Sequence, residues 1–297
     1  MVIAEWDGTM RRQSDDEVLI VGIVKDVSKT LVEDIERLSE AFSRFTKISW
    51  FLVESNSNDE TRKLLGELKK TQSDFNFVTL DASPDPKISR TVALAEARNR
   101  YVEEVTQNLK FQSIGHIVVS DFNNLNRKLT KAAVDSCFIG ENNWDVCCAN
   151  QSGRYYDIWA LRHPLWSPND CWEAHAFFRK YSLIPEIALI KSVNSRMIRI
   201  KPSSEWIEVD SAFGGLALYK RATFIKGVYA GLTPTHQPIC EHVPFNLSLR
   251  AQGAKIFINP KLINFHRTDH SMRSGLGYQM FRLIQYPVKL FRNIFDS

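Results

Sequence analysis

Short apolar runs alternate along the first 120 residues with segments whose apolar positions recur every three or four residues. The runs favour strands buried on both faces of a sheet, and the three- and four-residue spacing favours amphipathic helices. Strands are predicted over 17–24, 48–53, 75–80 and 116–120, and helices over 30–45, 59–70 and 89–105. This alternation predicts an α/β fold with a mainly parallel sheet and helices on both faces.

The pattern is less regular in the second half of the chain. Residues 155–206 are rich in aromatic residues, proline and histidine and have weak periodicity, which is typical of an excursion from the framework. Around this excursion, strand character is found over 144–149, 209–219 and 255–258, and a helix that Gly253 would cap over 243–252. We expect an irregular acceptor half to follow a regular nucleotide-binding half.

The composition fits one large globular domain. The chain has 297 residues, of which 44% are hydrophobic and 24% charged. We expect a nucleotide-binding half at about 15–130, an acceptor half at about 131–270 and a C-terminal tail at about 271–297. The net charge is only +4 and the basic residues are spread along the chain, so nucleic-acid binding is not expected.

The cysteines and the two ends of the chain indicate in which cellular compartment the protein is expected. The five cysteines are odd in number and lack CxxC spacing, which favours buried thiols in a reducing compartment over disulfides or a zinc site. No secretory signature or run of about 18 apolar residues is found, so we expect a cytoplasmic protein. Residues 278–295 mix apolar side chains with Arg282, Lys289 and Arg292, although Pro287 interrupts them. This tail could contact a membrane interface peripherally or dock onto the domain.

Polar residues follow the predicted strands at their carboxyl ends, where ligands of doubly wound sheets bind. Asp121 directly follows a buried strand, and Asn123 comes two residues later. A carboxylate and an amide oxygen suit a hard cation such as Mn²⁺ or Mg²⁺, bound together with phosphate oxygens. Both residues would equally suit a cap between a strand and a helix.

Three stretches together resemble GT-A glycosyltransferases, in particular the capsule-associated mannosyltransferase family of the cryptococcal type. They are the Glu-x-Asn-Ser-x-Asp-x-Thr stretch beginning at Glu54, the helix with Leu-Ala-x-Ala-Arg-Asn around Arg98, and Asp121-x-Asn123. The resemblance covers roughly residues 17–265 and implies a nucleotide-sugar donor. It implies that Arg98 lies near the diphosphate and that His266 supplies a third metal ligand. Asn123 departs from the family pattern, which has a second aspartate there.

The resemblance also implies a set of donor, catalytic and acceptor residues. It places Glu54, Asn56 and Asp59 near the nucleotide, although turns and helix caps use the same residue types. Glu241 would be the catalytic base of an inverting enzyme, and the region of Asp210 would serve a retaining one. Acceptor contacts are expected from Tyr156, Asp157, Trp159, Gly214 and Gly215. Aromatic residues also build cores, and paired glycines also form β-bulges.

The function expected from these features is transfer of a hexose from GDP-mannose or a UDP-sugar to a glycan or lipid-linked glycan, in surface or capsule polysaccharide synthesis. A nucleotidyltransferase and a non-catalytic carbohydrate- or nucleotide-binding protein are the alternatives. An NAD-dependent oxidoreductase is disfavoured because the turn at 25–29 lacks GxGxxG.

Overall fold

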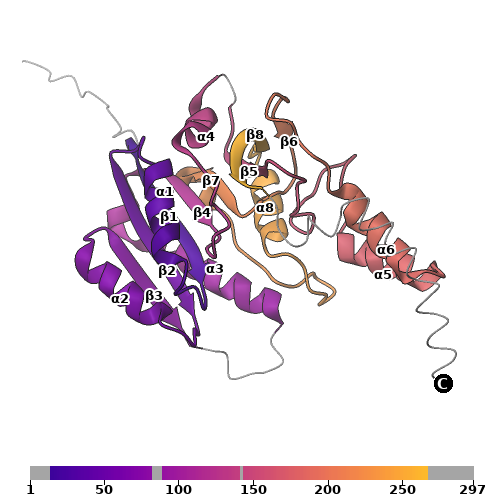
Figure 1. Ribbon diagram of the computed structural model, residues 1–297, viewed down its shortest axis with the longest axis horizontal. Helices are drawn as coiled ribbons and strands as arrows, with labels where there is room; N and C mark the ends of the chain where they lie inside the picture. The colour runs from indigo at the N-terminus through magenta and orange to yellow at the C-terminus, as the bar shows by residue number, and fades with distance from the viewer. Residues whose placement is uncertain (1–13, 82–88, 141–142, 267–297) are drawn as a thin grey trace, which may run out of the picture.

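The computed structural model describes residues 14–81, 89–140 and 143–266. These form one eight-stranded sheet with the order β3-β2-β1-β4-β7-β5-β8-β6 (Figure 1). The strands are β1 (Ser14–Val24), β2 (Lys47–Ser55), β3 (Phe75–Leu80), β4 (Ile114–Ser120), β5 (Val146–Gln151), β6 (Ile207–Glu208), β7 (Leu216–Lys220) and β8 (Ile256–Phe265). The α-helices are α1 (Leu31–Ala41), α2 (Thr61–Thr71), α3 (Arg90–Gln107), α4 (Lys131–Asp135), α5 (Cys171–Tyr181), α6 (Pro185–Ser192), α7 (Arg221–Phe224) and α8 (His242–Arg250).

Most strand pairs are parallel. β1 pairs in parallel with β2 and β4, β2 with β3, and β5 with β8. β7 runs antiparallel between β4 and β5, and the short β6 runs antiparallel to β8. The predicted α/β fold class with a mainly parallel sheet is therefore confirmed.

Helices cover both faces of the sheet, as the sequence predicts. On β1, Leu19 and Val21 belong to a core with residues of α3, whereas Val18 and Ile20 belong to a second core with residues of α1, α2 and α4. The alternation follows from strand geometry, because successive side chains point to opposite faces. The near-continuous apolar run of β1 thus serves two cores at once.

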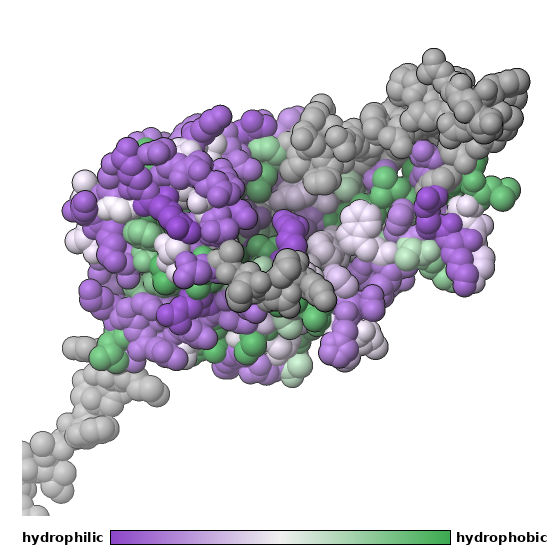
Figure 2. Space-filling view, turned by 90° about the horizontal axis from the view of Figure 1, so that it is seen from below, coloured by the Kyte–Doolittle hydropathy of each residue, from purple (hydrophilic) through white to green (hydrophobic). Residues whose placement is uncertain are grey.

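The excursion at 155–206 contains two helices, α5 and α6, that the sequence pattern does not predict. In Figure 1 they lie together at one end of the molecule, away from the parallel strands. Figure 2 shows hydrophobic and hydrophilic residues side by side at this end, on the right, whereas hydrophilic residues predominate around the sheet. These helices lack a clear apolar stripe because their exposed positions also carry apolar side chains, such as Phe177 and Tyr181 on α5.

Several smaller predictions can also be compared with the structure. All five cysteines are buried and unbridged, as expected. Gly253 has a φ of 86° after α8, where Ala254 N–H donates to the carbonyl of Leu249 (3.1 Å), so it closes that helix as predicted. The tail at 271–297 lies outside the described residues. Within the described ranges, no helix has the length and apolar character needed to cross a bilayer.

Gly22 provides a test of the packing between β1 and the end of β4. A methyl group there would lie 2.5 Å from both the Ser120 carbonyl oxygen and the Phe122 ring. Because a backbone atom cannot easily move, we expect Gly22→Ala to lower the free energy of unfolding by about 2 kcal/mol in urea denaturation. Gly66→Ala in α2, where nothing lies within 4 Å, is the control and should raise it by about 1 kcal/mol. Equal stability of Gly22→Ala and wild type would contradict the close packing.

Candidate functional site

Asp121 lies at the point where the strand order of the sheet reverses. The chain builds outward from β1 through β2 to β3 and then returns to β4 on the other side of β1. The parallel strands β1 and β4 therefore end side by side, and Asp121 directly follows β4. In open α/β sheets such a reversal opens a crevice beyond the carboxyl ends of the strands, and ligands bind there.

A buried arginine connects Asp121 to two other parts of the chain. Arg98 on α3 donates from Nε to Glu241 (2.9 Å), from Nη1 to the Tyr101 hydroxyl (3.0 Å) and from Nη2 to Asp121 (3.3 Å). The side chains of Arg98 and Glu241 are 5% and 6% exposed, whereas that of Asp121 is 34% exposed. We call these four residues the Arg98 cluster; Asp121 is its solvent-accessible carboxylate.

The arrangement of α3 explains how Glu241 reaches Arg98. Asn99, next to Arg98, exchanges two hydrogen bonds with the backbone of Tyr229, at 2.9 and 2.8 Å. Gly231 then passes so close to α3 that a methyl group on it would lie 2.3 Å from the Thr91 backbone. These contacts tie the loop before α8 to α3, which brings Glu241 beside Arg98.

The loop after β4 is held by α1. Asp34, a buried residue of α1, accepts from the backbone N–H groups of Asn123 and Asn124, both at 2.9 Å. Asn123 and Asn124 have φ values of 86° and 62°, a left-handed conformation that asparagine tolerates better than most residues. Sequence reasoning missed Asp34, although one signal was present: it is an acid within the apolar stripe that includes Leu31 and Leu38.

The paired glycines bring the predicted acceptor residues beside Asp121. The Asp157 carboxylate accepts from the N–H of Gly214 (2.9 Å), and the Gly215 carbonyl accepts from the N–H of Asp121 (2.9 Å). A methyl group on Gly215 would lie 3.1 Å from the Tyr156 hydroxyl oxygen. Both glycines have positive φ, at 74° and 86°, so the chain turns here in a way that side chains disfavour.

The electrostatics of the site are dominated by carboxylates. Burial raises the pKa of Asp157 to about 6; the Gly214 N–H opposes this shift and the charge of Asp121 adds to it. Burial also raises the pKa of Asp121, against the lowering effect of Arg98 and together with the raising effect of Glu241. Asp121 and Glu241 therefore share the field of the buried Arg98 guanidinium, whereas the charges of both carboxylates raise the pKa of Asp157.

The predicted nucleotide-binding residues Glu54, Asn56 and Asp59 make contacts within the neighbouring turns. The fully buried Glu54 accepts from the Ser57 N–H (2.5 Å) and from Arg62 Nε (2.7 Å). Asp59 accepts from the N–H of Ser28, in the turn after β1, at 3.0 Å, and Asn56 has a φ of 51°. Asp59 thus connects the turn after β2 to the turn after β1. The contact of Glu54, Asn56 and Asp59 with a nucleotide stays a prediction.

The three residues predicted to bind a metal ion differ in the chemical groups that they offer. Asp121 offers a partly exposed carboxylate, Asn123 is exposed, and His266 Nδ1 lies 2.7 Å from the Ser152 hydroxyl. Among the described residues, no three His, Cys, Asp or Glu side chains are grouped to hold a metal ion. Of the three predicted ligands, Asp121 offers the oxygen donor with a charge, which is the type that a hard cation prefers.

The two predicted catalytic carboxylates lie at opposite ends of α8. Glu241 directly precedes the helix, whereas Asp210 pairs with Arg250, its last residue, at 3.5 Å. A helix of nine residues is about 13 Å long. Of the two, only Glu241 belongs to the Arg98 cluster.

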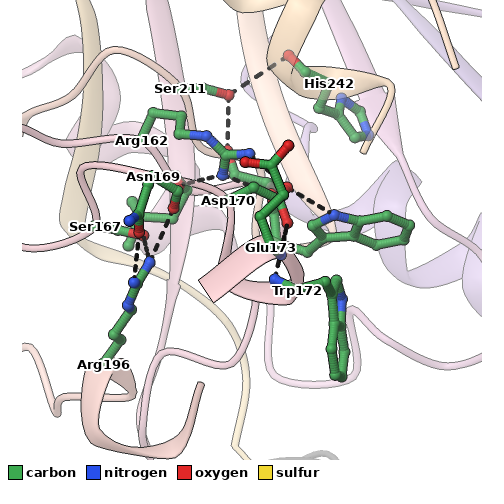
Figure 3. Close-up of polar contacts among 12 residues, drawn as sticks. Arg162, Ser167, Asn169, Asp170, Trp172, Glu173, Arg196, Ser211 and His242 are labelled. Carbon is green, nitrogen blue, oxygen red and sulfur yellow. Dashed lines mark hydrogen bonds and ion pairs between the residues drawn. The ribbon is translucent and has the colours of Figure 1, made fainter. Parts of the chain in front are cut away.

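The remaining predicted acceptor residue, Trp159, belongs to a polar network with Asp170 and Arg162. Its indole N–H donates to Asp170 (3.0 Å), which also pairs with Arg162 (2.7 Å). Figure 3 shows Arg162, Asp170 and Arg196 from three successive segments of the excursion converging on one another. The network fixes the shape of 159–196, and the half-buried ring of Trp159 packs against the core.

Comparisons with known proteins find similarity in structure alone. No family model and no curated protein matches the chain. Among solved structures, it resembles the mannosyltransferase PcManGT from Pyrobaculum calidifontis, in complex with GDP-Man and Mn²⁺ (TM-score 0.45, 12% identity, 93% of this chain and 64% of that one). It also resembles S. aureus TarS 1-349 (0.44, 12%, 84% and 60%) and glucosyl-3-phosphoglycerate synthase from Mycobacterium tuberculosis (0.39, 13%, 90% and 82%).

The chain spans about three-fifths of the length of the first two of these proteins. With TM-scores below 0.5 and identities of 12–13%, these similarities do not identify an activity for this chain.

The raised pKa of Asp157 predicts a dependence of stability on pH. Between the ordinary value of 3.8 and about 6, the folded chain binds more protons than the unfolded chain, so this group lowers the free energy of unfolding as pH rises. Asp157→Asn removes that loss. We therefore expect the variant to gain stability relative to wild type as pH rises. Its free energy of unfolding minus that of wild type should increase by about 2 kcal/mol from pH 4 to pH 7.

Urea denaturation at several pH values measures this difference. Asp74→Asn, at a 46% exposed side chain paired with Lys47, is the matched control and should follow the wild-type pH dependence. An Asp157→Asn profile parallel to wild type would show that burial does not perturb this carboxyl group.

Proposed function

We propose that this protein is a glycosyltransferase that binds the diphosphate of a nucleotide-sugar donor at Asp121. The observation that carries the proposal is the position of Asp121: a partly exposed carboxylate at the reversal point of the sheet, with its orientation set by the buried Arg98. A carboxylate in this crevice is suited to a cation that bridges phosphate oxygens. The resemblance of three sequence stretches to GT-A enzymes supports the same assignment.

The charge of the site supports a requirement for a divalent cation. A diphosphate is an anion, and it would approach the carboxylates of Asp121, Asp157 and Glu241. Arg98 pairs with Asp121 and Glu241, and the charge of Arg90 also acts on Asp121. Mn²⁺ or Mg²⁺, held by Asp121 and the donor phosphates, would neutralise the departing diphosphate during transfer. Asn123 and His266 are the further ligands that the sequence suggests.

Arg98 then acts mainly by positioning. Three of its five N–H groups are already engaged, and its side chain is only 5% exposed. Two N–H groups are left for a phosphate, on a side chain that is almost fully enclosed. We propose that it fixes the Asp121 carboxylate relative to the diphosphate.

The acceptor side of the site is formed by Tyr156, Asp157 and the glycine pair. In an inverting displacement at the anomeric carbon, a base takes the proton of the acceptor hydroxyl, and a carboxylate is suited to that role. Glu241 is the base suggested by the sequence, but it is buried and bound to Arg98. Asp157 is the less enclosed of the two, and its pKa of about 6 leaves it mostly ionised at neutral pH.

We also propose the chemical classes of the donor and the acceptor. We propose a hexose donor, GDP-mannose or a UDP-sugar, and a glycan or lipid-linked glycan acceptor in surface polysaccharide synthesis, as the sequence resemblance implies. A binding protein without turnover is the alternative, favoured by the missing second carboxylate at Asn123.

Substitution of Asp121 tests the assignment directly. We expect Asp121→Asn to reduce transfer from a panel of sugar nucleotides by at least about 100-fold, because one charged cation ligand is lost. Asp74→Asn should retain wild-type turnover, since its side chain is on the surface and paired with Lys47. Turnover of Asp121→Asn equal to wild type, with the same donor, would refute the site.

Calorimetry tests the role of the cation independently of turnover. We expect GDP or UDP to bind about 10-fold or more tightly with Mn²⁺ than with a chelator, because the carboxylates repel the bare diphosphate. In Asp121→Asn the cation should add much less affinity. Binding that is equally tight with the chelator would show that the diphosphate lies away from these carboxylates. Binding with no transfer by wild type would favour the non-catalytic alternative.

A further inference from the structure

An exposed patch of aromatic and basic side chains lies at the tip of α5 and α6. Phe177 and Tyr181 on α5 are 61% and 67% exposed and pack against each other with ring centroids 5.1 Å apart. Phe178 contacts Phe177 at 5.7 Å, Lys180 lies over the Tyr181 ring at 5.4 Å, and Lys191 of α6 lies over the Phe178 ring at 5.5 Å. We call these five residues the tip patch.

Exposed apolar side chains are concentrated around the tip patch. Of the twelve large hydrophobic residues exposed among the described ranges, seven lie in the segment 165–198: Leu165, Trp172, Phe177, Tyr181, Leu183, Leu189 and Ile198. Exposed apolar residues that cluster in this way mark interaction surfaces, whereas scattered ones do not. The right-hand end of Figure 2 shows this mixture of hydrophobic and hydrophilic surface.

The charge around the patch indicates what it contacts. Between residues 171 and 201, the exposed basic side chains are Arg179, Lys180, Lys191, Arg199 and Lys201, and the only acids are Glu173 and Glu186. Aromatic rings combined with lysine and arginine are the features by which proteins hold the interface of an anionic bilayer. Each basic residue near such a surface strengthens its attraction to anionic lipid.

The same charge argues against coverage by the C-terminal segment of the chain. Residues 278–295 carry Arg282, Lys289 and Arg292 and no acid. Two basic surfaces repel each other, whereas both are attracted to anionic lipid. We propose that the tip patch docks peripherally on the surface of an anionic lipid bilayer, with Phe177 and Tyr181 entering the interface and Lys180 and Lys191 facing the headgroups.

Vesicle co-sedimentation of the full chain tests this docking. The probes are phosphatidylcholine vesicles with and without about one-third phosphatidylglycerol, an anionic content at which basic residues bind measurably. We expect wild type to bind the anionic vesicles about 10-fold more tightly than the neutral ones. Phe177→Ser with Tyr181→Ser should weaken anionic binding about 10-fold by removing inserted apolar area.

Matched variants separate the patch from general surface effects. Leu109→Ser with Ile139→Ser removes two comparably exposed apolar side chains outside the segment, 77% and 71% exposed, and should bind as wild type does. Lys180→Glu with Lys191→Glu should lose most of the preference for anionic vesicles, and it remains informative if the serine variant is unstable. Circular dichroism and calorimetry with nucleoside diphosphate show whether each variant keeps its fold and donor site.

Two results would overturn the proposal. One is wild type that fails to bind anionic vesicles. The other is anionic binding that both tip-patch variants retain, which would assign the contact to another segment such as 278–295. Neither result bears on Asp121, whose role is measured by transfer and by diphosphate binding.

Discussion

The site depends on one buried guanidinium, that of Arg98, which has three partners. The Arg98 guanidinium is almost fully enclosed, and it is held by Glu241, Asp121 and the Tyr101 hydroxyl. A charge removed from water is tolerated only when its hydrogen bonds are satisfied by partners of good geometry, and removal of one partner from such a pair costs about 3–5 kcal/mol. The three partners come from α3, from the end of β4 and from the residue before α8. Arg98 therefore fixes three separate parts of the chain relative to one another.

Lysine could not replace this arginine without loss. An ammonium group presents three donors from a single atom, whereas the planar guanidinium presents five in fixed directions. In Arg98, Nε faces Glu241, Nη1 faces Tyr101 and Nη2 faces Asp121, so each nitrogen serves a different partner. The geometry of the guanidinium is thus what holds Asp121 at the mouth of the crevice while Glu241 stays buried.

The sequence predicts the parallel half of the fold well because its signals there are local. Apolar runs such as that of β1 and the three- to four-residue spacing of α1 are set by burial on the sheet, and both are visible in a single segment. α5 and α6 are not predicted because their outer surfaces stay exposed and carry Phe177 and Tyr181, so no polar face marks the solvent side. Similarly, the structure brings Asp157 beside Gly214 across 57 residues, and no local pattern specifies that contact.

For the candidate site, the sequence indicates residue types, whereas their partners come from the fold. The contact of Glu54 with a nucleotide stays a prediction; its carboxylate is engaged by Ser57 and Arg62, because a fully buried acid must be paired within the protein. Asp121 differs because its carboxylate, which pairs with Arg98, stays about a third exposed. Arg98 pairs with Glu241 and Asp121 together, and the charge of Arg90 also acts on Asp121. Removal of either carboxylate would leave one donor of the buried guanidinium without its partner. Under the proposed function, a cation that accompanies the anionic donor would ease the approach of its diphosphate to these carboxylates.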